Sequence, residues 1–229
     1  DPFGGWITWP AYAPDRLAEV RVTRGGGSGI YGSGALAGTI EMESIGASDQ
    51  GPGLRGGIAY GSRQSLDASA LATASLGAGF GFLSASYARG NGFIPIIASQ
   101  RGSVDRPAPY RQASLAARGI VPLGQATELQ ASLMGFTDRR ERGTAYSENG
   151  GDGADASLRL VHRGHWGVQA LAYVQLRKFT SNAVSINASR TVATPSVSQY
   201  NVPSTGLGAR LEIRPPLGAN SELRMGADW

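Results

Sequence analysis

The chain has 229 residues, of which 34 are Gly and none is Cys, and its formal net charge is +4. The absence of Cys excludes disulfide frameworks, thiolate metal sites and Cys nucleophiles. No apolar run reaches the 18 residues that indicate a membrane-spanning helix. The 21 Lys and Arg residues are scattered along the chain instead of forming a continuous patch, which argues against nucleic-acid binding.

The first 50 residues contain two short predicted strands, at residues 19–24 and 38–43, joined by a Gly-rich stretch. Residues 27–32 read G-S-G-I-Y-G and match G-x-G-x-x-G. A dinucleotide site would require a helix and a βαβ unit after this motif, but another strand and then hairpins follow. We therefore interpret the glycines as positions of positive φ or close backbone packing.

From residue 54 onward the dominant pattern is period-two alternation of apolar and polar residues, which is typical of β-strands. The longest blocks run about 9 to 12 residues, longer than ordinary globular strands and close to the length of a tilted membrane strand. A soluble β-sandwich is the competing interpretation, because its strands alternate too. The nine alternating blocks lie at residues 54–62, 65–76, 83–87, 112–118, 128–133, 155–160, 166–175, 207–214 and 222–229.

The connections between these blocks alternate in length, apart from a tight link at residues 63–65. Bacterial outer-membrane barrels have short periplasmic turns and longer extracellular loops, so this rhythm favours a barrel. The short connections are residues 77–79, 122–126, 163–165 and 215–220, and the long polar ones are about 89–109, 138–153 and 179–204.

Residues 17–40 carry a family resemblance. They read L-A-E-V-R-V-T-R-G-G-G-S-G-I-Y-G-S-G-A-L-A-G-T-I. This segment resembles the end of the plug domain of TonB-dependent outer-membrane receptors, with the pattern (I/V)-E-V-x-R-G-x-x-S-x-x-Y-G-x-x-A-x-x-G-x-I. One departure is that three glycines follow Thr23 and Arg24 where Arg-Gly-Pro is commoner. Residues 1–6 look like the ligand-side loop of the plug in one branch of the family.

The resemblance implies an all-β fold: a fragment of a 22-stranded antiparallel transmembrane β-barrel preceded by the end of a plug domain. We expect the C-terminal part of the plug at residues 1–50 and the first nine or so barrel strands at residues 51–229. The chain begins without Met and stops inside an alternating block, so we expect it to be a piece of a receptor. Nine strands cannot close such a barrel, which predicts a curved open sheet with two unpaired edges.

The function implied by the resemblance is TonB-dependent active import of a scarce nutrient across the bacterial outer membrane. Ferric siderophores, cobalamin and saccharides are typical cargoes. The implied partners are outer-membrane lipid, the nutrient ligand and the TonB complex, which would act through a segment not in this chain. We expect no enzyme activity, cofactor or metal site. The alternatives are a structural or adhesive barrel, or a passive porin, although a porin needs no plug.

Candidate ligand-binding residues fall on the plug and in the loops. Aromatic faces on the plug suit stacking on a ring-bearing ligand, although Trp6 and Trp9 fit equally well as packing residues against the barrel wall. Arginines in the loops suit anionic groups, and each also fits as an ordinary solvated charge. The candidates are Trp6, Trp9, Tyr12, Ser28, Tyr31 and Ser33 on the plug, and Arg101, Arg106, Arg139, Arg140 and Arg142 in the loops.

Charged residues on the polar face of the strands are expected to hold the plug by polar pairs, because charges inside a barrel must be paired or wet. They are Arg118, Arg159, Arg210, Arg214, Arg224, Glu128, Glu212, Glu222 and Asp228. His162 and His165 stand at a strand end with diverging side chains, so we predict no metal site there.

Overall fold

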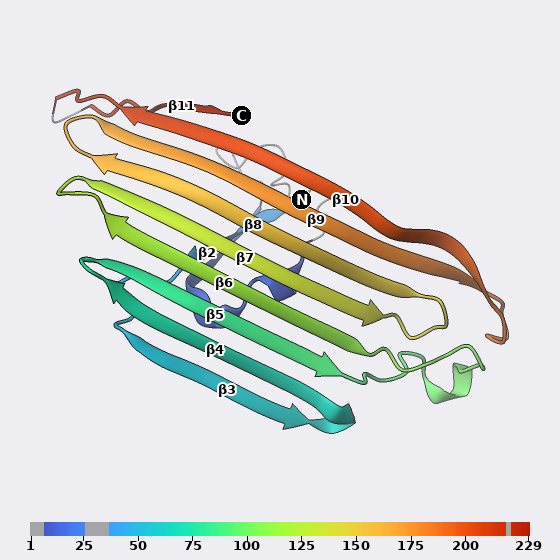
Figure 1. The fold of residues 1–229 in the computed structure, drawn as a ribbon. Coiled ribbons are helices and arrows are strands. Elements are labelled where there is room, and N and C mark those ends of the chain that lie inside the picture. The colour runs from blue at the N-terminus through green and yellow to red at the C-terminus, as the bar shows by residue number, and fades with distance from the viewer. Residues whose placement is uncertain (1–6, 26–36, 219–220) are drawn as a thin grey trace.

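The computed structural model describes residues 7–25, 37–218 and 221–229, and these form two antiparallel sheets (Figure 1). The smaller sheet pairs β1 (Leu17–Arg24) with β2 (Gly38–Ser44). The larger sheet has nine strands: β3 (Gly53–Gly61), β4 (Ser65–Leu76), β5 (Gly79–Gly90), β6 (Tyr110–Pro122), β7 (Thr127–Glu141), β8 (Glu148–Arg163), β9 (Gly167–Ile186), β10 (Ala193–Arg214) and β11 (Met225–Asp228). Four short 3-10 segments complete the elements: η1 (Trp9–Ala11), η2 (Pro14–Arg16), η4 (Ser62–Gln64) and η5 (Ala98–Gln100).

Each strand of the larger sheet pairs with its neighbours in the chain, in the order β11 to β3. Over the described residues β3 and β11 pair on one side only, so the sheet is open. The predicted all-β fold and the open antiparallel sheet are thereby confirmed. No helix among the described residues is long and apolar enough to cross a membrane.

The side of the larger sheet that faces β1 and β2 is called here the inner face. Paired residues on adjacent strands point to the same side of a sheet, which places Leu71, Ser84, Ala116, Met134 and Asp155 in one row on this face. Figure 1 shows the segment with β2 lying across this side of the sheet, behind β4 to β8.

The inner face is sealed at mid-sheet by apolar packing. Ile45, which follows β2, is 3% exposed and packs with Leu71, Phe80, Phe82 and Ala116. The 3-10 segments contact the same region, η1 against β6 and β7, and η2 against β4. In the sequence this packing is indicated by Leu71, which is an apolar residue on the otherwise polar face of its strand.

The opposite side, called the outer face, carries an apolar belt. On β6 it occupies every second position from Ala113 to Val121, about 26 Å along the strand at 3.3 Å per residue. This matches the apolar band of about 25 Å on outer-membrane barrels. Leu83, Leu115 and Leu133 on this face are more than half exposed.

Two of the predicted long connections are wrong. β7 continues to Glu141 and β8 starts at Glu148, while β9 continues to Ile186 and β10 starts at Ala193. Past the apolar belt β7 and β8 carry polar or Gly residues on both faces, whereas β9 and β10 carry scattered apolar residues, such as Phe179 and Val197, that do not alternate regularly. The hydropathy pattern therefore disappears although the backbone pairing continues. The connection between β5 and β6, residues 91–109, is long as predicted, whereas residues 215–224 form a longer link than expected.

Candidate functional site at the loop end of the sheet

Three connections meet at the end of the sheet opposite the short turns, and together they are called the loop cluster. They are residues 91–109, 142–147 and 187–192. The first lies against both others: the Arg106 amide donates to the Gly143 carbonyl at 2.9 Å and the Val104 amide donates to the Arg190 carbonyl at 3.2 Å. Residues 91–109 therefore join hairpins that are distant in sequence.

A buried ion pair fixes this arrangement. Arg190 Nε donates to Asp105 Oδ2 at 2.8 Å, and the Asp105 side chain is fully buried. Asp105 Oδ2 also accepts from the Gly102 amide at 2.8 Å. The hydrogen bond from Arg190, followed by that from Gly102, lowers the pKa of Asp105 from 3.8 to about 2. The carboxylate is therefore charged throughout the ordinary pH range.

Three of the predicted loop arginines lie in this cluster. Arg101 Nε donates to the Ile96 carbonyl at 2.7 Å, which ties its side chain to its own loop. Arg106 lines a hollow of about 330 Å³ together with Tyr146 and Tyr200. Arg142 is exposed, and its backbone amide donates to the Ser147 carbonyl at 3.0 Å. The structure thus gathers these three residues at one end of the sheet.

Arg139 and Arg140 lie on β7 instead of in a loop, which corrects the predicted placement. Being consecutive in a strand, they point to opposite faces. Arg140, on the inner face, places Nε 3.0 Å from both carboxylate oxygens of Asp138. Arg139, on the outer face, donates through Nη2 to Asp152 Oδ2 at 2.8 Å. Only Arg140 therefore faces the side on which the plug is expected.

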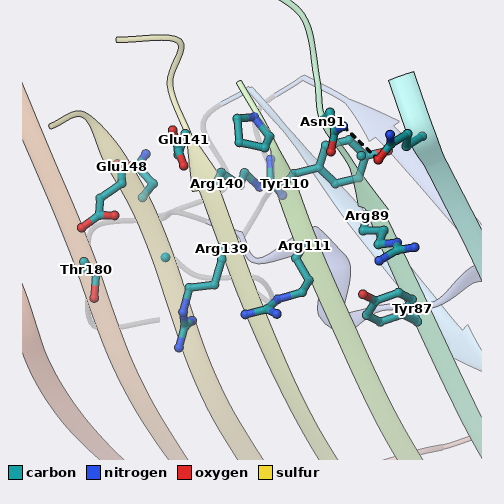
Figure 2. Close-up of a pocket in the computed structure, with 15 residues that line it drawn as sticks. Tyr87, Arg89, Asn91, Tyr110, Arg111, Arg139, Arg140, Glu141, Glu148 and Thr180 are labelled. Atoms are coloured by element: carbon teal, nitrogen blue, oxygen red, sulfur yellow. Dashed lines mark hydrogen bonds between the residues drawn. The ribbon is translucent and has the colours of Figure 1, made fainter. Parts of the chain in front are cut away.

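A hollow of about 500 Å³ on the outer side of the loop end contains residues that the sequence alone did not single out (Figure 2). Tyr87, Arg89, Arg111 and Arg139 project from three neighbouring strands into it, and Glu141 and Glu148 border it toward the loops. Arg89 and Arg111 carry no sequence signal of a site, because their closeness depends on strand register and not on any local motif.

The described plug candidates lie at mid-sheet. Trp9, in η1, is 50% exposed, and the Tyr12 ring centroid is 5.7 Å from Arg16 Cζ. Arg16 is buried and donates through Nη2 to the Ala11 carbonyl at 2.7 Å and to Met134 Sδ at 3.2 Å, and its burial lowers its pKa. The remaining candidates, Trp6, Ser28, Tyr31 and Ser33, lie outside the described residues.

The charged residues of the inner face pair mainly along the sheet. Arg118 donates to Gln130 at 3.1 Å, and Arg214 donates to Glu212 at 2.7 Å. These partners lie on the same or a neighbouring strand, so the pairs stiffen the inner face more than they hold the segment above it. His162 Nδ1 is 2.8 Å from Thr127 Oγ1, which occupies that ring nitrogen in a side-chain hydrogen bond.

Comparison with known proteins identifies solved structures of similar fold. No protein-family model and no curated protein matches the sequence. The siderophore receptor PiuA from Acinetobacter baumannii superimposes with a TM-score of 0.69 at 13% identity, over 93% of this chain and 34% of that receptor. The siderophore receptor PirA from the same organism gives 0.65 at 11% identity, over 94% and 35%. The chain shares their fold and spans about a third of their length.

Proposed function

We propose that this chain is part of a TonB-dependent outer-membrane receptor that imports a scarce nutrient, with a siderophore-bound iron as the first candidate cargo. One observation carries the proposal: a meander with an apolar outer belt bears a separate two-stranded segment on its polar inner face. The resemblance of residues 17–40 to the plug end supports it. The two solved receptors of similar fold are named as siderophore receptors, which favours transport over catalysis.

In this proposal residues 1–50 belong to the plug and residues 51–229 to the barrel. The buried contact of Ile45 with Leu71, Phe80 and Phe82 supports a plug seated against the wall. Such a contact argues against a passive pore, because a segment packed on the inner face narrows the lumen of the barrel. Transport then requires energy to move the segment, which is the role proposed for the TonB complex.

The ligand would first meet the loop cluster and then the inner face beneath it. Arg101, Arg106 and Arg142 in the cluster and Arg140 below it offer guanidinium groups to an anionic ligand, which an Arg fork binds well. Trp9 and Tyr12 offer aromatic faces deeper in, and Trp6, Ser28, Tyr31 and Ser33 complete the proposed plug site. Arg139 is the exception, since it faces outward.

Uptake in cells tests the proposal. A strain lacking the complete gene should grow more slowly than its parent on a ferric siderophore as the sole iron source, and the gene should restore growth only when the TonB complex is intact. Restoration without TonB would support the passive pore. In the same strains the protein should leave membranes only with detergent and migrate differently when unboiled, whereas release at high pH would contradict the barrel.

A further inference from the structure

We propose that Arg89 and Arg111 form a binding site on the outer face for the phosphate of a lipid headgroup. Together with Arg139 they are called the arginine row, and the three residues lie on β5, β6 and β7. Arg89 pairs with Arg111 across the strands, and Arg111 pairs with Arg139. The inference rests on the proposed location of the sheet in the outer membrane.

The row has an unfavourable arrangement that calls for a counterion. Side chains at directly paired positions have Cβ atoms about 5 Å apart, and like charges there destabilise a sheet. Arg139 is relieved by Asp152 at 2.8 Å. Arg89 and Arg111 are exposed and form no ion pair with any residue in the described part of the chain. Two neighbouring guanidinium groups are thus left to an external anion.

The row stands at the level where a lipid headgroup would lie. On β6, Arg111 is four residues from Leu115 of the apolar belt, about 13 Å along the strand. Tyr60 of β3 and Leu66 of β4 continue the same row, and Tyr87 lies one step closer to the belt. Aromatic side chains at the rim of an apolar band are typical of the membrane interface. A lipid could thus place its acyl chains on Leu83 and Leu115 beneath its phosphate.

The acidic neighbours locate the anion over β5 and β6. Glu141 and Glu148 lie above the row on the loop side (Figure 2), and Glu148 accepts a hydrogen bond from Asn182 at 2.8 Å. Asp152 lies beneath Arg139 on β8. All three carboxylates border the β7 and β8 side, where they repel an anion. Arg89 and Arg111 can each donate to phosphate oxygens, which guanidinium binds in fork geometry.

Lipid retention by the complete protein tests this site. The protein would be reconstituted in phosphatidylcholine nanodiscs containing phosphatidic acid, and native mass spectrometry would count retained phosphatidic acid. The variant Arg89→Gln with Arg111→Gln should retain it with roughly thirtyfold lower affinity, the effect expected for two interfacial cations. The matched control, Arg118→Gln with Arg159→Gln, removes two charges from the inner face and should retain the lipid as the unaltered protein does.

Several results would overturn the site. The site is wrong if the Arg89→Gln, Arg111→Gln variant retains as much phosphatidic acid as the unaltered protein. It is also wrong if the inner-face control loses as much phosphatidic acid as that variant. Inorganic phosphate that competes as well as phosphatidic acid would show a simple anion site instead of a lipid site. Unboiled migration checks that each variant is folded. A protein that leaves membranes without detergent would contradict the proposed barrel itself. A protein that inserts normally, but whose two variants retain phosphatidic acid equally well, would contradict only the lipid site.

Discussion

The mid-sheet contact and the loop cluster are two attachments built from different interactions. At mid-sheet, Ile45 packs with Leu71, Phe80 and Phe82, all below 10% exposure, so apolar burial holds the residues that follow β2 against the sheet. At the loop end, three connections are joined by backbone hydrogen bonds and the Asp105–Arg190 pair. Truncation of a buried side chain should therefore disturb the mid-sheet contact. Removal of a charge, or of the close backbone approach, should disturb the loop cluster.

Truncation of Phe82 should have the largest effect. Phe82→Ala leaves a cavity at mid-sheet and should destabilise the protein by about 3–5 kcal/mol in chemical denaturation, with faster proteolysis of residues 37–52. The control Leu133→Ala alters an outer-face side chain that is 60% exposed and leaves no such cavity. Equal losses in the two variants would show that the inner face is no better packed than the outer one.

Gly102 tests the backbone fit of the loop cluster without changing any charge. A Cβ atom added here would lie 2.0 Å from the Arg190 carbonyl oxygen, so Gly102→Ala must push the two connections apart. We expect a cost of about 1–3 kcal/mol, measured by thermal unfolding. Gly57→Ala is the control, because nothing lies within 4 Å of a Cβ there. An unchanged Gly102→Ala variant would refute the close contact.

The charge of the loop cluster is tested by Asp105→Asn, which removes the partner of Arg190. Cleavage of residues 91–109 by a protease should become several-fold faster. Asp49→Asn is a matched control, since Asp49 also accepts a backbone hydrogen bond from the residue three positions before it, Gly46, at 2.7 Å. If both variants respond equally, the backbone hydrogen bond matters and Arg190 does not.

The same pair predicts a pH dependence. The folded pKa of Asp105, about 2, lies below its ordinary value of 3.8, so its stabilising contribution is complete above about pH 4 and lost as the pH falls toward 2. Hydrogen exchange of residues 97–106, corrected for intrinsic rates, should stay constant from pH 7 to 4.5 and rise below pH 4. A rise centred near pH 6 would contradict this assignment.

The smallest effect is expected on the outer face. Asp152→Asn breaks the ion pair with Arg139, whose side chain is 49% exposed, and exposed pairs contribute less than about 1 kcal/mol. The melting temperature in neutral detergent should move by only a degree or two. A loss comparable to that of Phe82→Ala would mean that the arginine row is structural.

Much of the sheet was predictable because hydropathy alternation reports directly on which face of a strand meets apolar surroundings. The nine strands and the short turns at residues 77–78 and 123–126 follow from it. The outer parts of β7 to β10 did not, because those of β7 and β8 are polar on both faces and the apolar residues in those of β9 and β10 do not alternate regularly. In β10 the pairing also slips between Pro195 and Val197 and between Gln199 and Val202, which shifts side chains between faces.

The site was predictable only in part. That Arg139 and Arg140 point in opposite directions follows from their adjacency in a strand, once the strand is known to extend that far. The Asp105–Arg190 pair joins residues 85 positions apart, and no local pattern marks it. The arginine row likewise depends on the register of three strands. Such contacts arise from tertiary placement, which a single sequence does not display.

The order of the strands has a consequence for assembly. Each of the nine strands pairs only with its neighbours in sequence over the described residues, so the sheet can grow hairpin by hairpin with short loop closures. The 3-10 segments η1 and η2 and residue Ile45 precede the sheet in the chain, yet they pack on β4 to β7. They can dock only after those strands have paired. The N-terminal part of the chain, although synthesised first, is therefore among the last parts to fold.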